Sequence, residues 1–151
     1  MATGALSPRQ VYAELKAFAR DHGANDGTYW LWFELLWRDY FRLLHLQYGA
    51  ALYRARGLSK LPPAPHNPRG FDRWCRGDTG QPLVDAAMRE LASTGYLSNR
   101  LRQVVASYLI YDLRGDWRAG AAWFESQLVD YDVYSNPVSY THLTLPTIYS
   151  V

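Results

Sequence analysis

The sequence predicts an all-α domain whose helices pack orthogonally, and three observations lead to this fold class. Helix-capping residues recur along the chain, each followed by an apolar pattern of helical period. Between residues 28 and 48, aromatic and aliphatic side chains recur at spacings of three and four, the period of one helix face. No alternating strand pattern occurs before residue 137. At 151 residues, the chain is long enough for one domain with its own core.

The first two helices have clear local signals. Ser7, Pro8 and Gln10 form a capping box with a proline in the first turn, and Gly23 ends that helix. A long aromatic helix is expected from about residue 28 to residue 49, with a short helix possible within the eight residues that follow. The next stretch, LSKLPPAPHNPRG, is rich in proline and is therefore expected to be a loop.

Four later helices follow from glycine stops and polar caps. Gly77 and Gly95 end the first two of them, and Ser98 and Asp116 cap the last two. The predicted ranges are residues 70–76, 82–94, 98–113 and 117–129.

Composition limits the classes of function. The formal net charge of +2 is too small to argue for nucleic-acid binding by itself. Cations nevertheless gather between residues 54 and 76, a surface that suits phosphates, and a solvated, solubilising loop is an equal alternative. The cations are Arg54, Arg56, Lys60, Arg69, Arg73 and Arg76, and the single acid among them is Asp72.

Several classes of site find no support in the sequence. Cys75 is the only cysteine, so no disulfide can form within the chain and a reducing, cytoplasmic compartment is the default. No signal peptide or bilayer-length apolar run is recognisable. The four scattered histidines show no metal-ligand spacing, and there is no glycine-rich phosphate loop.

A carboxylate in the middle of the aromatic helix raises the question of function. Glu34 lies on the same face as Trp30, Trp37 and Phe41, and Arg38 follows it by four residues. One interpretation is a helix packed in a core, with a Glu34–Arg38 ion pair at its edge. The other is a polar contact at the floor of a pocket for a flat aromatic ligand. The helix alone leaves both open.

The last residues differ in character from the rest. Residues 137–151, PVSYTHLTLPTIYSV, have β-branched residues and no helical period. A DNA string encoding PVSYTHLTLPT is similar to the transposase-end adaptor of sequencing libraries. We therefore expect residues 1–136 to form a partial domain and residues 137–151 to be an artefactual tail.

Three segments carry a resemblance to a known family. They are ELLWRDYFR, GDTGQPLVDAAMRELASTGYLSNR and NRLRQVVASYLIYDLRGDWRAGAAWFESQLVDYDVYSN. Over residues 4–136 the chain resembles the helical FAD-binding domain of the photolyase/cryptochrome family. The run YWLWFELLWRDYF and Gln103, where typical bacterial dimer photolyases carry Met, are similar to the cryptochrome-DASH branch.

The resemblance implies a cofactor and a reaction. Family members hold folded FAD at the base of a cavity and use light-driven electron transfer from reduced FAD to split cyclobutane pyrimidine dimers. The lesion must leave the base stack, which costs less in single-stranded DNA, the form associated with DASH members. The implied protein is a deoxyribodipyrimidine photo-lyase, monomeric, without a membrane, and associated with the bacterial nucleoid through DNA.

The resemblance also implies roles for individual residues. Glu34, Trp37, Asn99 and Gln103 are expected near the dimer, with Trp37 stacking on it, and Trp117 is expected to relay electrons to the flavin. Trp37 and Arg100 are expected to contact DNA. Arg102 is expected beside the flavin ring with Asp112 as its ion-pair partner. The full set of implied flavin-binding residues is Glu34, Arg38, Asn99, Arg102, Asp112, Asp130, Asp132 and Asn136.

The resemblance covers only part of the family's sequence. The beginning of the chain is similar to the middle of the family's sequence, so an antenna domain carrying a pterin or folate, and the segment that cradles the flavin phosphates, would precede it. The 151-residue chain is therefore expected to hold FAD weakly or not at all and to be inactive alone. The alternatives are a cryptochrome photoreceptor without repair activity and a cofactor-free helical interaction module.

Overall fold

The computed structural model describes residues 4–58 and 65–136. The interpretation of residues 137–151 as a tail lies outside the described residues. Within the described ranges the chain is helical and contains no strand, which confirms the predicted all-α class. The elements are α1 (Pro8–His22), α2 (Asp26–Tyr48), η1 (Gly49–Tyr53), α3 (Pro68–Arg76), α4 (Pro82–Thr94), α5 (Asn99–Ser107), η2 (Tyr108–Asp112) and α6 (Trp117–Gln127).

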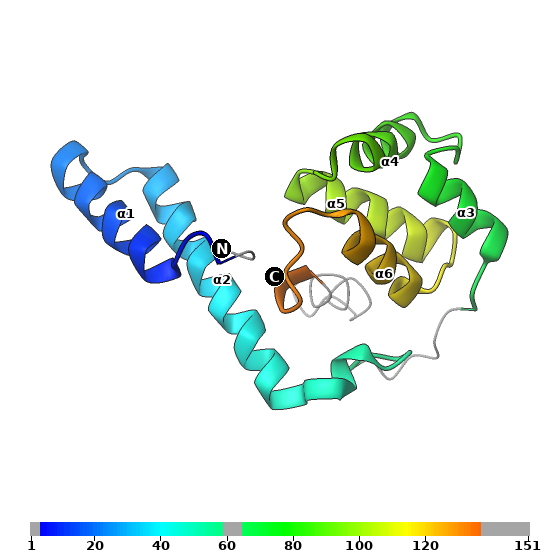
Figure 1. Cartoon of the computed structure of the whole chain (residues 1–151), viewed down its shortest axis with the longest axis horizontal. Helices are drawn as coiled ribbons and strands as arrows, with labels where there is room; N and C mark the ends of the chain where they lie inside the picture. Colours follow the sequence, from blue (N-terminus) through cyan, green and yellow to red (C-terminus); the bar gives the residue numbers. More distant parts are fainter. Residues whose placement is uncertain (1–3, 59–64, 137–151) are drawn as a thin grey trace, which may run out of the picture.

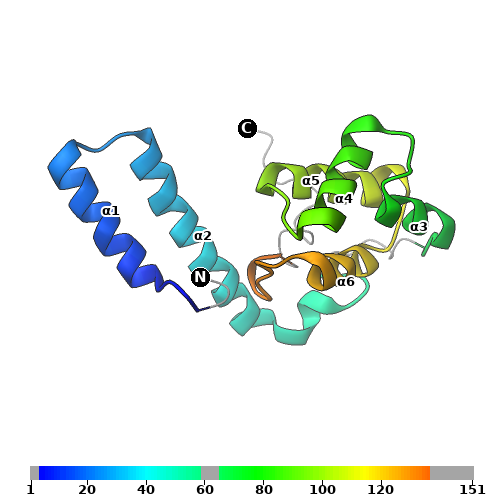
Figure 2. The same cartoon turned by 45° about the horizontal axis from the view of Figure 1, so that its top comes forward.

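Helices α1 and α2 form a hairpin that extends away from the body made by α3 to α6 (Figures 1 and 2). The predicted capping box of α1 is present, with the Gln10 side chain accepting from the Ser7 backbone N–H at 3.1 Å. Helix α2 begins two residues earlier than predicted because Asn25 caps it. The Asn25 side chain accepts a hydrogen bond from the Thr28 backbone N–H at 3.0 Å, and the Thr28 hydroxyl oxygen accepts one from the Asn25 backbone N–H at 2.9 Å.

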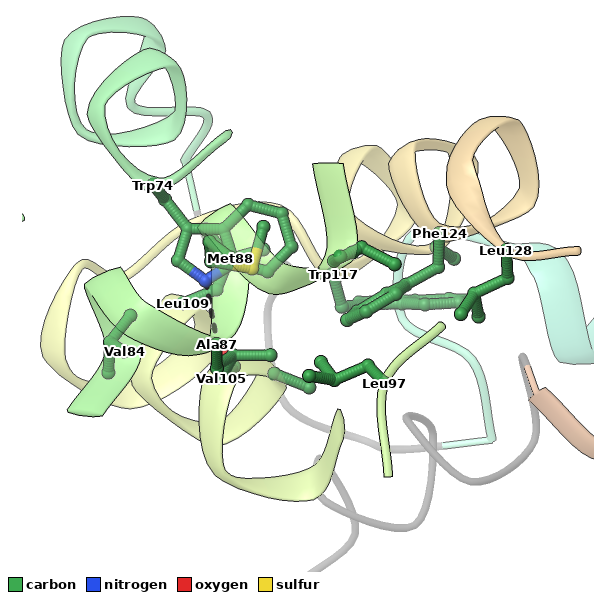
Figure 3. Close-up of a cluster of buried hydrophobic side chains, with 13 residues drawn as sticks. Trp74, Val84, Ala87, Met88, Leu97, Val105, Leu109, Trp117, Phe124 and Leu128 are labelled. Atoms are coloured by element: carbon green, nitrogen blue, oxygen red, sulfur yellow. Dashed lines mark hydrogen bonds between the residues drawn. The ribbon is translucent and has the colours of Figure 1, made fainter. Parts of the chain in front are cut away.

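The core lies among α3, α4, α5 and α6 (Figure 3). Trp74 on α3 is fully buried, and its Nε1 donates to the Val105 carbonyl oxygen of α5 at 2.9 Å. Its ring stacks on Phe71 and meets Phe124 of α6 edge to face, with centroids 5.9 and 5.7 Å apart. Trp74 therefore joins three helices of the body, α3, α5 and α6.

The predicted helix from residue 98 to residue 113 changes its winding near its end. After α5, the element η2 is a π-helical turn, in which the Leu113 N–H donates to the Tyr108 carbonyl oxygen five residues earlier at 3.1 Å. This turn holds the buried Leu109 against α6. A Cβ at Gly120 would lie only 2.6 Å from Leu109 Cδ2, so α6 needs a glycine there for close approach.

Candidate functional site

A pocket of about 490 Å³ lies where α2 meets the body of the domain. One wall is a single face of α2, which carries residues at positions i, i+3, i+4 and i+7. The other walls come from the α4–α5 link, from α5 and from residues 128–136, which we call the acidic loop. The lining residues are Glu34, Trp37, Arg38, Phe41, Tyr96, Leu97, Asn99, Arg102, Asp130 and Ser135.

The α2 wall combines exposed aromatic rings with a carboxylate. Trp37 is exposed and sits among Phe33, Tyr40 and Phe41, with ring centroids 5.5 to 6.0 Å away. Glu34 is exposed, and among the described residues its carboxylate makes no hydrogen bond or ion pair. Of all residues of α2, Leu35 alone is buried within the described part of the chain. The carboxylate therefore stands beside aromatic rings with its acceptors available to a ligand.

The structure contradicts the interpretation of Glu34 as half of a structural ion pair. Arg38 pairs instead with its neighbour Asp39, Nη1 to Oδ1, at 3.2 Å. The Nε of Arg38 is buried and has no acceptor among the described residues. An unmatched buried donor is costly. The Arg38 side chain thus presents an unsatisfied cationic donor at the edge of the pocket.

Arg102 is the most tightly held charged group of the pocket. Its Nε donates to the Leu97 carbonyl oxygen at 2.7 Å, and its Nη2 lies 2.9 Å from both carboxylate oxygens of Asp130. Its guanidinium carbon lies 5.9 Å from the Tyr96 ring centroid. The Arg102 side chain is only 12% exposed, whereas that of Asp130 is 47% exposed. A fixed positive group is therefore built into the pocket wall.

The predicted ion pair between Arg102 and Asp112 is wrong. It assumed one continuous α-helix, in which ten residues span nearly three turns. The π-helical turn changes the phase of the helix before Asp112, and Asp112 is exposed and outside the pocket lining. Arg102 is paired by Asp130 from the acidic loop instead.

The acidic loop is folded by its own side chains. Asp132 Oδ1 accepts from the backbone N–H groups of Tyr134 and Ser135 at 2.9 and 3.0 Å. Asn136 is buried, and its Oδ1 accepts from the Asp132 N–H at 2.9 Å. Asp132 and Asn136 therefore shape the loop and lie outside the pocket lining, while Asp130 faces the pocket.

Of the remaining predicted residues, one lines the pocket and three lie outside its lining. Asn99 lines the pocket beside Arg102, one turn away on α5. Gln103 and Arg100 are exposed and lie outside the lining. Trp117 is buried in the core, and its Nε1 donates to the Ala55 carbonyl oxygen at 3.1 Å. The structure thus brings six of the predicted residues into one pocket: Glu34, Trp37, Arg38, Asn99, Arg102 and Asp130.

Sequence reasoning missed four residues of the lining. Phe41 could have been found, because it follows Glu34 by seven residues on the same helical stripe. Tyr96 and Leu97 lie in the link after Gly95, and Ser135 lies in the acidic loop. Nothing in the local sequence pattern of these three residues signals a site, because they reach the pocket through tertiary packing.

A second pocket, of about 550 Å³, lies between α1 and α2. Its lining is mostly apolar, with Val11, Leu15, Phe18 and Leu31 among its members. No predicted site residue lies in it. We therefore place the candidate site in the pocket that contains Glu34 and Arg102, where charged and aromatic side chains converge.

Two classes of feature are not seen in the described ranges. No helix within residues 4–58 and 65–136 is long and apolar enough to cross a bilayer. In the same residues, no group of three or more His, Cys, Asp or Glu side chains could hold a metal ion.

Comparisons with known proteins place this geometry in a family. A family model for the FAD binding domain of DNA photolyase matches residues 30–146, a range that extends past the predicted boundary at residue 136. Cryptochrome DASH of Xenopus laevis is 54% identical over 137 residues, which are 90% of this chain and 26% of that protein. The chain thus spans about a quarter of the length of this curated relative.

Two solved structures share the fold. The crystal structure of Synechocystis sp. PCC6803 cryptochrome aligns with a TM-score of 0.92 at 50% identity, over 95% of this chain and 30% of that chain. An archaeal photolyase from Sulfolobus tokodaii, solved with two FAD molecules, aligns with a TM-score of 0.72 at 32% identity, over 86% of this chain and 30% of that chain. The chain belongs to the photolyase/cryptochrome family, as part of its helical FAD-binding domain, and resembles the cryptochrome DASH branch.

Proposed function

We propose that this chain forms one wall of the flavin- and lesion-binding cavity of a light-dependent DNA repair enzyme that splits cyclobutane pyrimidine dimers. One observation carries the proposal: six residues from three separate segments line a single pocket in which Glu34 is unpaired among the described residues. A carboxylate that no neighbour uses, beside an exposed Trp37 ring, is suited to an aromatic base with polar edges.

The residues present fit FAD. The buried Nε of Arg38 lacks an acceptor among the described residues, and a flavin supplies acceptors on its ring edge and its phosphates. Arg102 provides a fixed positive charge held by Leu97 and Asp130. FAD bound here would supply the light-driven electron transfer that opens the cyclobutane ring. Support also comes from the FAD named in the Sulfolobus tokodaii photolyase structure.

The roles of the chain's own residues follow from their positions. The Trp37 ring would stack on the displaced bases, and Glu34 would accept hydrogen bonds from their polar edges. The cost of base displacement favours single-stranded substrate. Arg100 is exposed near the start of α5, where its charge would contact a DNA phosphate.

The proposal also includes residues outside the pocket lining. Trp117 would relay electrons, Gln103 would lie near the dimer, and Asp112, Asp132 and Asn136 would support flavin binding. A pterin or folate antenna would belong to a domain outside this chain. A cytoplasmic location stays a prediction, since one relative, from Solanum lycopersicum, is named as chloroplastic/mitochondrial.

The second candidate is a blue-light photoreceptor without repair activity. The name cryptochrome, which the Xenopus laevis and Synechocystis relatives share, favours it. A photoreceptor needs the flavin contacts of Arg102 and Asp130, but it does not need a carboxylate and an indole facing a lesion. The open Glu34 and Trp37 therefore favour repair.

A segment exchange tests the proposal. Residues 4–136 replace the matching segment of Synechocystis cryptochrome, and light-dependent loss of cyclobutane dimers is measured in a single-stranded oligonucleotide. We expect repair, and we expect Glu34→Gln to slow it about tenfold, because a charge-assisted hydrogen bond is lost. Glu90→Gln, at an exposed position of α4, is the matched control and should leave the rate unchanged.

Each outcome separates the candidates. A hybrid that binds flavin but repairs no dimer, while the unexchanged relative does repair, would refute the repair proposal and favour the photoreceptor. A folded hybrid without flavin would favour the cofactor-free helical module.

A further inference from the structure

His45 at the end of α2 and Tyr53 in η1 contact the acidic loop, which lies about 80 residues later in the chain. The Tyr53 hydroxyl in η1 donates to the Val133 carbonyl oxygen at 3.1 Å, across 80 residues. The same hydroxyl lies 3.1 Å from Nδ1 of His45. Neither His45 nor Tyr53 lines the pocket.

The hydrogen-bonding capacity of the two groups fixes the direction of this chain. The Tyr53 hydroxyl has one proton, and the Val133 carbonyl can only accept, so that proton is used on Val133. The contact with His45 is then satisfied only if Nδ1–H donates to the hydroxyl oxygen. The chain therefore runs from the imidazole of His45 through Tyr53 to the loop backbone, and His45 carries its proton on Nδ1.

Ring contacts reinforce the hydrogen bonds. The His45 ring meets the Tyr134 ring edge to face with centroids 5.0 Å apart, and it meets the Tyr53 ring at 5.5 Å. Partial burial, with the charges of Tyr134 and Glu125, raises the pKa of Tyr53, so the phenol keeps its proton at neutral pH. His45 and Tyr53 thus contact two successive loop residues, Val133 and Tyr134.

These contacts act on the same loop that carries Asp130. The loop follows α6, and near its start the Val129 N–H donates to the carbonyl oxygen of Gly95, the residue that ends α4, at 3.0 Å. The next residue, Asp130, pairs with Arg102. Its tip turns on Asp132, which accepts from two loop N–H groups. Contact from η1 at Val133 gives the tip an anchor outside the body helices.

We propose that His45 and Tyr53 are positioning residues, which hold the acidic loop in the conformation that sets Asp130 against Arg102 at the edge of the pocket. The relevance of this clamp to flavin binding rests on the proposed function, whereas the clamp itself does not. Its consequence is that the end of α2, where His45 lies about two turns beyond Trp37, contributes together with η1 to the shape of the proposed cofactor site.

The test is amide hydrogen exchange by NMR in the 151-residue chain without flavin. Tyr53→Phe removes only the hydroxyl, and the N–H groups of Tyr134, Ser135 and Asn136 are protected by bonds within the loop. We expect these amides to exchange about three- to tenfold faster, the loss typical of one or two hydrogen bonds. Tyr12→Phe, at an exposed position of α1, is the matched control and should change nothing.

Histidine variants and a side-chain signal complete the experiment. His45→Asn keeps a donor near the Nδ1 position and should stay within about twofold of the wild-type exchange rates, whereas His45→Leu should match Tyr53→Phe. In both His45→Leu and Tyr53→Phe the Arg102 Nε–H resonance should shift, because Asp130 moves with the loop.

Three results would overturn the proposal. The first is that the loop amides exchange at the same rate in Tyr53→Phe as in Tyr12→Phe. The second is that core amides, such as that of Val105, exchange faster by the same factor as the loop amides. The third is that the Arg102 Nε–H resonance does not shift. Because no flavin is present, a failure of FAD binding in other assays would count against the proposed function and not against the clamp.

Discussion

Arg102 and Asp130, 28 residues apart, meet with one guanidinium nitrogen 2.9 Å from both carboxylate oxygens. Their pairing joins α5 to the acidic loop. The pair forms one wall of the pocket, and Glu34 and Trp37 of α2 form another. The Arg102 side chain has a second tie, to the Leu97 carbonyl oxygen. The arginine is therefore both a structural link and a fixed charge.

Replacing this arginine by lysine should weaken the fold. Lysine keeps the charge but cannot donate to Leu97 and Asp130 together in the same geometry. We expect Arg102→Lys to lower the free energy of unfolding by about 2 kcal/mol, since the buried Leu97 carbonyl loses a charged donor. Urea unfolding measures this. Arg100→Lys, two residues earlier and exposed, should cost less than about 0.5 kcal/mol, and equal losses would contradict the account.

Asp85 at the start of α4 should be needed for stability. Its carboxylate is buried and accepts from the Thr79 N–H, the Thr79 hydroxyl and the Gly80 N–H at 2.7, 2.6 and 3.0 Å. Asp85→Asn replaces one acceptor oxygen by a donor, which leaves at least one of these groups unmatched. We expect a loss of about 1 to 3 kcal/mol in urea unfolding, whereas Asp78→Asn at an exposed position should be near neutral.

The Asp85 carboxylate should make the free energy of unfolding fall as the pH becomes acidic. Burial alone would raise the pKa of Asp85, but the hydrogen bonds from Thr79 and Gly80 and the charge of Arg89 outweigh it and lower that pKa. The unfolded state then binds the proton more readily, so the stabilisation is present above the unfolded pKa of about 4 and is lost as pH falls through the lower folded pKa.

Unfolding measured between about pH 7 and pH 3 tests this sign. Wild-type stability should fall at the acid end, and Asp85→Asn should fall less, so that the difference between the two proteins narrows. Parallel profiles for the two proteins would show that Asp85 does not carry the effect. Burial tends to raise the pKa of Asp116, but its contacts with Arg118 outweigh burial and lower it. Asp116 should therefore make the stability of both proteins fall somewhat at acid pH.

Trp74 should be the most sensitive aromatic residue of the body. It has no exposed surface, and its indole links α3 to α5 through Val105. Trp74→Phe removes that hydrogen bond and leaves a cavity, so we expect a loss of about 2 to 3 kcal/mol. Trp32→Phe on the exposed face of α2 is the control, with an expected change below about 1 kcal/mol. Thermal or urea unfolding that ranks the two variants the other way would disprove this assignment of the core.

Helix positions were predictable because their signals are local. Ser7, Gly77, Gly95 and Asp116 cap or end helices where the sequence indicates, since each cap depends on residues three or four positions away. Helix α2 begins two residues before its predicted start, because Asn25 caps it and Asp26 is its first residue.

The sequence indicates which residues line the site better than it indicates which of them pair with one another. The spacing of Arg102 and Asp112 suggested a pair, but a π-helical turn altered the helix phase, and no local pattern marks that turn. Glu34 and Arg38 have favourable spacing, yet Arg38 pairs with Asp39. The Arg102–Asp130 pair and the His45–Tyr53–Val133 chain join distant segments, so they follow from tertiary packing alone.

The measurement that most directly tests the central claim is the flavin content of Synechocystis cryptochrome carrying residues 4–136 of this chain. The protein is purified in the dark, and bound FAD per chain is read from its visible absorbance, with the unexchanged relative as reference. We predict the same content as the reference, falling clearly when Arg102 is replaced by Gln. A hybrid that unfolds cooperatively but is colourless, beside a reference that is yellow, would contradict the claim that this pocket holds a flavin.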